Sequence, residues 1–216
     1  LLPVSPDVEV APLVSDFGNV ELPGSATTVV TIQNIGGSDL HVSALTLVAG
    51  SSPYVSIKSA PVLPLTLAAD ASCEVTLEFE PRTLGPAAAT LAVVSDDPDE
   101  GTVLVALSGQ GVASSAPPAE QVATTLEFYV ESAAEGSLQG TEPAGSGDAH
   151  LEALLNQIKA ASDLAAAGKL DAACKQLENA LKRTDGDPQP PDFVTGPAAA
   201  ELRLLIELTR VAMGCR

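Results

Sequence analysis

The chain has few aromatic residues, and that scarcity limits what it can bind. Trp is absent and aromatic residues make up 3% of the 216 residues, although 45% of residues are apolar. Ala, Val and Leu therefore have to form the core, which favours thin sandwiches and small helical bundles over a deep aromatic ligand pocket. The same lack of aromatic platforms argues against sugar binding and glycoside chemistry.

Positive charge is also scarce. Lys and Arg number 10 against 28 Asp and Glu, which gives a formal net charge of −18. An excess of this size repels phosphate backbones and anionic lipid surfaces, so nucleic acid and such membranes are not expected partners. Residues 1–112 hold 13 acidic and 2 basic residues, so copies of this half should repel each other unless a cation intervenes. The acidity itself has two interpretations, solubility outside the cell or a cation-binding surface.

Long apolar runs are missing too. No run reaches 18 apolar residues, so we expect no transmembrane helix. The chain begins at Leu1 without a charged, apolar leader, which leaves a processed secreted protein or a fragment as alternatives. The content of Ala, Thr, Ser, Pro and Gly favours the first, with a secreted, extracellular or cell-surface location.

Few residues are suited to catalysis. His41 and His150 are the two histidines, and they fall in different halves of the chain. Neither has an obvious Ser or Cys nucleophile nearby. Gly109-Gln110-Gly111 lacks the helix and the lysine that follow in a phosphate-binding loop. We therefore expect no enzymatic activity and no cofactor.

Short alternating apolar runs, separated by turn residues, fill residues 1–112. The clearest lies at 72–80, where Cys73, Val75, Leu77 and Phe79 alternate with polar residues, which indicates a strand with one buried face. About seven such strands predict an immunoglobulin-like β-sandwich. The expected strands are 8–10, 16–20, 28–34, 40–48 with a bulge near Ala44, 72–80, 87–94 and 102–107.

The period of the pattern changes after a linker at 113–118, which is rich in Ala, Ser and Pro. Leu151, Leu154, Leu155 and Ile158 illustrate the helical spacing that follows. We predict an antiparallel four-helix domain over 119–216. Its expected helices are about 119–135, 148–167, 169–185 and 196–213.

The order of the motifs in the first half resembles a known family. The motifs are Asp16-Phe17-Gly18-Asn19-Val20, Asn34-Ile35-Gly36, Leu40, Phe79-Glu80-Pro81, Gly85, Ser95-Asp96-Asp97-Pro98 and Leu107-Ser108-Gly109-Gln110-Gly111. Residues 7–112 resemble the Hydin-type (ASH) immunoglobulin-like domain, which is related to the major-sperm-protein fold and to the repeats of choice-of-anchor D surface proteins. The resemblance implies a non-catalytic module for anchoring, adhesion and assembly.

The second half carries a resemblance of its own. The stretch from Gly168 to Leu177 resembles the FIMAH-like helical domain, which is often appended to secreted bacterial enzymes and surface proteins. Residues 183–196 resemble a recurring tail of secreted bacterial proteins. The first helix departs from the usual pattern of that family.

Three cysteines are present. Cys174 lies on an apolar helical stripe and Cys215 is next to last in the chain, and a disulfide between them would pin the last helix to its neighbour. The alternative is two unlinked, buried thiols. Cys73 is expected to be a small buried apolar residue, or else an intermolecular link. Without a close His or a CxxC spacing, a zinc site is not expected.

The densest acidic cluster is Asp96, Asp97, Asp99 and Glu100. Its carboxylate oxygens could bind Ca²⁺. The alternative is an ordinary Asp-Pro turn between two strands.

These observations predict a non-enzymatic, secreted structural or adhesive protein. It would be a subunit of an extracellular filament or cell-surface assembly that is held by β-sandwich contacts, either with itself or with another surface protein. The segment Leu1 to Pro12, through Val4, Val8 and Val10, would add a strand to a neighbour's sheet edge. The alternative is a recognition module, for protein or glycan, from a larger secreted protein.

Overall fold

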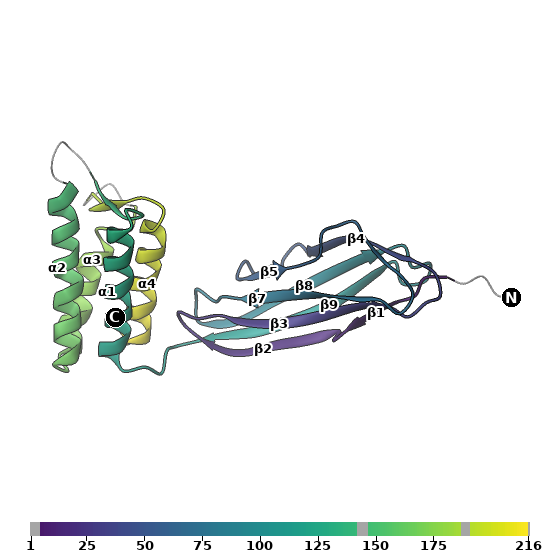
Figure 1. Cartoon of the computed structure of the whole chain (residues 1–216). Helices are drawn as coiled ribbons and strands as arrows, with labels where there is room; N and C mark the ends of the chain where they lie inside the picture. The colour runs from purple at the N-terminus through teal and green to yellow at the C-terminus, as the bar shows by residue number, and fades with distance from the viewer. Residues whose placement is uncertain (1–4, 142–146, 187–190, 216) are drawn as a thin grey trace. The chain divides into compact units, whose positions relative to one another are not determined.

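The computed structural model describes residues 5–141, 147–186 and 191–215. The chain divides into two compact units, Leu1–Val112 and Ala113–Arg216. A β-sandwich followed by four helices is what the sequence predicted, and the structure contains both (Figure 1).

The first unit is a sandwich of two sheets. One sheet has four strands in the order β1-β3-β7-β5, and the other has five in the order β2-β9-β8-β4-β6. We refer to them as sheet A and sheet B. The strands are β1 (Val8–Ala11), β2 (Val14–Glu21), β3 (Ala26–Asn34), β4 (Leu40–Leu47), β5 (Val55–Ser59), β6 (Leu65–Leu67), β7 (Ser72–Phe79), β8 (Gly85–Ser95) and β9 (Thr102–Val112).

The inward residues of both sheets form one apolar core. Val75, Leu77 and Phe79 of β7 are fully buried, as their alternation predicted, and Cys73 is partly buried beside them. The bulge expected near Ala44 is present as a register shift between Val42 and Ala44. Every second residue therefore faces outward, which fixes the composition of the two outer faces.

The sequence ended the last expected strand at residue 107, but β9 continues to Val112. Gly109 and Gly111 lie within β9 and pair with β8. A Cβ on Gly109 would lie 2.8 Å from ring atoms of Phe79, and one on Gly111 would lie 2.9 Å from Cβ of Pro81. Only glycine lets the backbone come this close to the core, so these glycines serve packing and not chain reversal.

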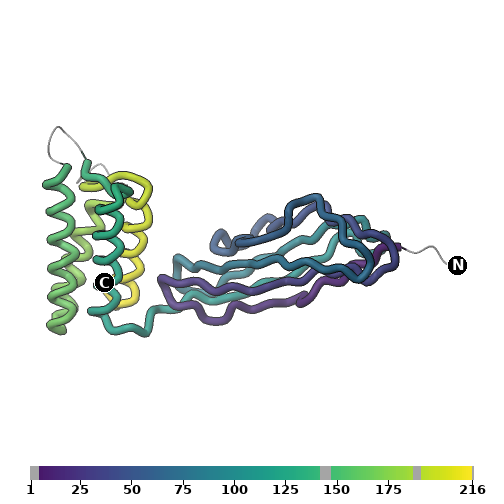
Figure 2. The backbone as a smooth tube through the Cα atoms, in the orientation of Figure 1, coloured from purple at the N-terminus to yellow at the C-terminus, as the bar shows by residue number. Residues whose placement is uncertain are grey.

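The second unit contains four helices and a small two-stranded sheet. The elements are α1 (Pro118–Ala134), β10 (Gln139–Gly140), α2 (Gly147–Ala166), α3 (Leu170–Leu181), β11 (Val194–Thr195) and α4 (Ala199–Ala212). Consecutive helices pack against each other and α4 returns to α1, so the helices lie side by side (Figure 2). Their apolar stripes meet in one core that includes Val122, Ile158, Leu177 and Ile206.

The last helix starts later than the sequence predicted. Thr195 pairs with Gln139 in the small sheet, and Gly196 has a positive φ of 110°, so the chain cannot enter the helix before residue 197. The sequence predicted that the third helix reaches residue 185. It ends at Leu181, because residues 182–185 form the turn that leads out of it.

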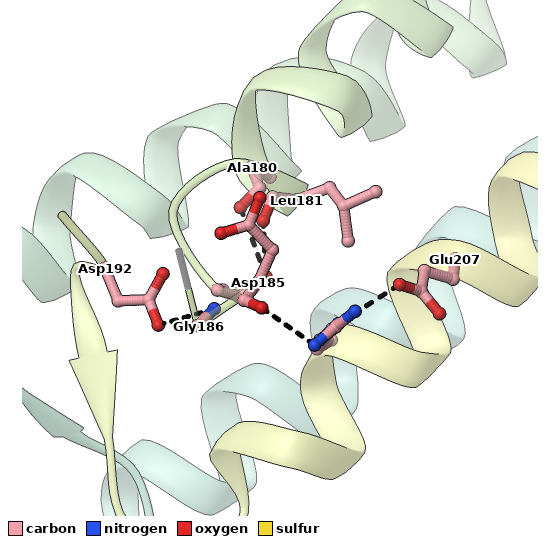
Figure 3. Close-up of polar contacts among 8 residues, drawn as sticks. Ala180, Leu181, Asp185, Gly186, Asp192 and Glu207 are labelled. Carbon is pink, nitrogen blue, oxygen red and sulfur yellow. Dashed lines mark hydrogen bonds and ion pairs between the residues drawn. The ribbon is translucent and has the colours of Figure 1, made fainter. Parts of the chain in front are cut away.

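A polar network holds that turn against α4 (Figure 3). Arg203 donates from Nη1 to the carbonyl oxygen of Asp185 at 2.8 Å and from Nε to Oε1 of Glu207 at 3.1 Å. The backbone N–H of Gly186 donates to Oδ2 of Asp192 at 3.0 Å. Because these contacts satisfy backbone groups of the turn, they fix its path.

A disulfide joins Cys174 of α3 to Cys215, three residues past the end of α4, with their Cα atoms 5.5 Å apart. The bond is the one that the sequence analysis expected, and it closes a loop with a sequence separation of 41 residues. Among the described residues no helix is long and apolar enough to span a membrane.

Candidate interaction surfaces of the sandwich

The N-terminal segment is part of the sandwich. β1 pairs antiparallel with β3 of the same chain, with Val8 opposite Asn34 and Val10 opposite Ile32. The side chains of Val8 and Val10 are only 3% and 6% exposed and belong to the core. Val8 and Val10 therefore already stabilise this chain, and the addition of this segment to a neighbour's sheet edge stays a prediction. Val4 lies outside the described residues.

Asn34 connects three segments at one end of the sandwich. It is fully buried. Its Nδ2 donates to the carbonyl oxygens of Ser38 at 2.8 Å and of Leu67 at 2.9 Å. Its Oδ1 accepts from the N–H groups of Gly36 at 3.0 Å and Asp7 at 3.4 Å. Asn34 thus uses both ends of its amide, and no other residue type offers that pattern at this length.

The acidic cluster at 96–100 forms a turn that holds β1. Oδ2 of Asp97 accepts from the N–H of Val8 at 2.7 Å, and Oδ1 accepts from the N–H groups of Asp99 and Glu100 at 3.1 and 3.3 Å. Oδ1 of Asp96 accepts from the N–H of His41 at 2.8 Å.

The described residues contain no group of three or more His, Cys, Asp or Glu side chains placed to hold a metal ion. The contacts of Asp96 and Asp97 are those of the turn alternative. The geometry therefore favours a structural turn over calcium binding at Asp96, Asp97, Asp99 and Glu100.

The environment of this turn shifts two pKa values in opposite directions. Burial by itself would raise the pKa of the Asp97 carboxyl, but the N–H groups that bind it outweigh burial and lower that pKa. The pKa of Asp99 is raised, because its carboxyl hydrogen-bonds to Asp97 and is repelled by its charge. The folded state thus favours a charged Asp97 and disfavours a charged Asp99.

We expect Asp97→Asn to lower the free energy of unfolding of the sandwich by about 2 kcal/mol at neutral pH, because an amide cannot accept from both sides. A lowered folded pKa gives stability that is present above the unfolded value of about 3.9 and is lost as pH falls through the folded value. The difference between the variant and the wild type should therefore shrink as pH falls below the unfolded value of about 3.9. Urea unfolding followed by circular dichroism at several pH values measures it.

Asp99→Asn is the matched control for this experiment. It changes a carboxylate two residues away in the same turn, but it removes a charge that the folded state disfavours. We expect no loss of stability at neutral pH. Equal losses in the two variants would contradict the role assigned to Asp97.

The edges of both sheets are poorly suited to receiving another strand. The edge strand β1 has its Val8 N–H occupied by Asp97 and is followed by Pro12. The edge strand β6 has three residues, and the edge strands β2 and β5 carry register shifts, at Asp16/Asn19 and Ile57/Ser59. Short strands, bulges and proline are devices that block edge pairing. Association is therefore more readily explained by the faces than by the edges.

The two outer faces of the sandwich differ in charge. Outward residues of sheet A include Glu9, Glu74, Glu78 and Lys58, and Lys58 forms an ion pair with Glu78 at 2.6 Å. By contrast, the outward positions of β4, β8 and β9, all of them in the described part of the chain, carry no Asp, Glu, Lys or Arg. We call this set the uncharged face. Its members are Ser43, Ala44, Thr46, Pro86, Ala88, Thr90, Ala92, Val94, Thr102, Leu104, Ala106, Ser108 and Gln110, with His41 at its end, and Ala92 among them is only 8% exposed.

Large apolar side chains lie on and beside the uncharged face. Leu104 is 55% exposed and Val14, which pairs with Ala106 from the neighbouring strand β2, is 71% exposed. Leu13 and Val48 are exposed at its margins. The acids of this sheet sit on β2, where Asp16 accepts from Ser108 Oγ at 3.0 Å. A contiguous apolar surface rimmed by polar groups is typical of an interaction site.

The remaining predicted residues occupy structural positions. His41 Nδ1 lies 2.9 Å from Thr66 Oγ1 in the first unit. His150 Nδ1 lies 2.9 Å from the carbonyl oxygen of Thr141 in the second unit, and its ring stacks on Phe193 at 4.8 Å. Burial raises the pKa of the Cys73 thiol.

One hollow of about 290 Å³ lies at the end of the sandwich and is lined by Tyr54, Phe79, Pro81 and Pro86 among others. Its lining includes the hydroxyl residues Ser52, Tyr54 and Thr83 but no carboxylate, histidine or cysteine.

Comparison with known proteins identifies the first unit. Residues 6–110 match the family model of the HYDIN/CFA65/VesB-like, Ig-like domain. An immunoglobulin-like domain is therefore present, as the motifs indicated. No curated protein matches the chain.

Solved structures similar to the chain come from several organisms. They include a protein of unknown function from Porphyromonas gingivalis (14% identity, TM-score 0.42, 49% of this chain and 46% of that one). An ASH/PapD-like domain of human CEP192 has 22% identity and a TM-score of 0.39, and 53% of this chain and 91% of that one are covered. The secreted serine protease VesC from Vibrio cholerae has 20% identity and a TM-score of 0.39, with 58% and 26% covered. The chain thus spans less than half of the first protein and about a quarter of VesC.

Proposed function

We propose that this chain is a non-enzymatic structural or adhesive protein of a secreted or cell-surface assembly, and that its sandwich makes the contacts. The observation that carries the proposal is the uncharged face. In a chain of net charge −18, three neighbouring strands keep every outward position free of charge. Water solvates charged faces well, so an uncharged face on one side only, with the exposed Leu104 on it and Val14 beside it, favours contact with another surface.

Localisation and the second unit fit the same proposal. The disulfide between Cys174 and Cys215 is compatible with an oxidising, extracellular compartment. The four helices would form an antiparallel, FIMAH-like domain appended to the sandwich. The acidic surface makes nucleic acid an unsuitable partner.

Strand addition by residues 1–12, through Val4, Val8 and Val10, is a less favoured form of the contact. β1 already pairs with β3 and buries Val8 and Val10 in its own sandwich, and the sheet edges are poorly suited to pairing, so we propose the uncharged face as the contact surface.

A second candidate is a recognition module from a larger secreted protein. The family match supports this candidate, because it covers residues 6–110 and does not extend into the helical unit. Both candidates use the sandwich for binding. They differ in whether the bound partner is part of an assembly or a separate target.

Leu104→Glu is expected to weaken retention of the purified chain on the surface of the cells that produce it at least about tenfold, equal to about 1.4 kcal/mol. A carboxylate at this position would have to be desolvated on contact. Binding of labelled protein to washed cells measures the effect.

Val29→Glu is the matched control, because Val29 is 43% exposed on the outer face of sheet A. It introduces the same charge into the opposite face of the same sandwich. Equal retention of wild type and both variants would contradict a contact role for the uncharged face.

A further inference from the structure

We infer that the partner of the uncharged face is a second copy of this chain, packed sheet against sheet. This inference rests on the proposed function and names the molecule that binds the uncharged face. It follows from the charge, the shape and the size of the face.

Charge restricts where two copies can meet. The first unit carries 13 acidic and 2 basic residues, so most pairs of surfaces would bring carboxylates together. Sheet A faces outward with Glu9, Glu74 and Glu78, and the turn at 96–100 adds four more acids. Among the described outer faces of the sandwich, the uncharged face has no acid of its own, and Asp16 and Glu21 on β2 and the 96–100 turn between β8 and β9 lie at its rim. It is therefore self-complementary in charge.

The shape of the face suits sheet packing. Its central strand β8 presents Ala88, Thr90, Ala92 and Val94, with Leu104 and Ala106 next to them on β9. Small and β-branched side chains make a low surface, and two such sheets can pack about 10 Å apart, as in the interior of a sandwich. Leu104 is exposed and pairs with the small Ala92 on the neighbouring strand of the same chain. The Leu104 side chain of one copy can therefore pack against small side chains of the other.

The size of the face sets the strength of the contact. β8 and β9 have 11 residues each, which spans about 36 Å at 3.3 Å per residue. Three strands about 4.8 Å apart give about 500 Å² per copy and about 1,000 Å² for the pair. That area is at the lower limit for a specific interface. The contact should therefore be weak in free solution, and it becomes effective where chains are held side by side on a surface.

Salt dependence distinguishes this contact from an ion-paired one. Two molecules of net charge −18 repel each other, while the uncharged face adds no ion pair. Salt shortens the range of the repulsion from about 30 Å at 0.01 M to about 3 Å at 1 M. Self-association should accordingly strengthen with added NaCl, whereas an interface built on ion pairs would weaken.

The test uses the purified full chain in sedimentation equilibrium, from about 10 µM to about 1 mM and at low and high NaCl. We expect the average mass to rise from 21.8 kDa toward two chains, with a dissociation constant of the order of 100 µM that falls at least about threefold with salt. Ala106→Glu and Ala106→Lys should each weaken association at least about tenfold. An equimolar mixture of the two should restore it, because opposite charges then meet.

Val29→Glu again serves as the control and should leave association unchanged. Circular dichroism and thermal melting check that the Ala106 variants, at an exposed position, remain folded. A mass of one chain at every concentration would overturn the inference. Association that Ala106→Glu leaves intact would overturn it as well.

The two proposals can fail separately. If the wild type stays monomeric but Leu104→Glu reduces binding to cells, the face binds a different protein and the second-copy inference is wrong. If neither self-association nor cell binding responds to the face variants, the proposed function fails too.

Discussion

Replacement of Asn34 by alanine is expected to lower the free energy of unfolding of the sandwich by about 4 kcal/mol. The side chain is fully buried and makes four hydrogen bonds to backbone groups. Alanine would leave the carbonyls of Ser38 and Leu67 and the N–H of Gly36 without these partners. Each buried polar group that loses its partner costs about 1–3 kcal/mol, and the bond to Asp7, at 3.4 Å, contributes least.

Urea unfolding followed by circular dichroism in the β region measures this loss. Gln33→Ala is the matched control, because it removes the neighbouring amide from an outward, half-buried position on the same strand. We expect that control to change stability by less than about 0.5 kcal/mol. A loss below about 1 kcal/mol for Asn34→Ala would show that other groups or water replace its bonds.

Removal of the disulfide is expected to destabilise the helical unit by about 4 kcal/mol. The chain-entropy relation gives this value for a loop of the observed length. The double variant Cys174→Ala, Cys215→Ala would release the end of α4 from α3, while the sandwich core contains neither residue. Thermal unfolding should therefore show a lower midpoint for the helical signal and an unchanged midpoint for the β signal.

Cys73→Ala is the control for the loss of sulfur alone. Cys73 is a free thiol that packs partly buried against the sandwich core, so its truncation should cost less than about 1.5 kcal/mol and should affect only the β signal. The disulfide prediction fails if the double variant and the wild type have the same helical midpoint without reductant.

The strands that the sequence predicted correctly are those with a strict alternation. In β7 the alternation from Cys73 to Phe79 specifies a buried face, and the structure buries it. The strands β5 and β6 were missed. β5 alternates Val55 and Ile57 with Ser56 and Lys58, but β5 has five residues and β6 has three, so the alternation is too short to stand out from the surrounding loops. They are strands because β7 and β4 offer them backbone partners.

The candidate sites also include features that the sequence predicted and features that it missed. The turn alternative for residues 95–100 follows from local Asp-Pro chemistry, and the structure is consistent with it. The bond from Asp97 to Val8 spans 89 positions in sequence, and no local pattern predicts it. Apolar alternation at Val8 and Val10 indicates burial but does not say in which molecule, and the structure places both in the core of their own chain.

The sequence by itself determined the two kinds of unit and the inward residues of the long strands, because these depend on periodicity and on residue type along the chain. Only the tertiary structure decided which outward residues share a surface. Ala92, Thr46 and Leu104 lie on three different strands, and strand order and register bring them together. Pairing partners are set by the cooperative fit of the whole core, so a face made of several strands is a property of the fold. The scarcity of aromatic and basic residues had excluded many functions, and the placement of the acids left one face free of charge.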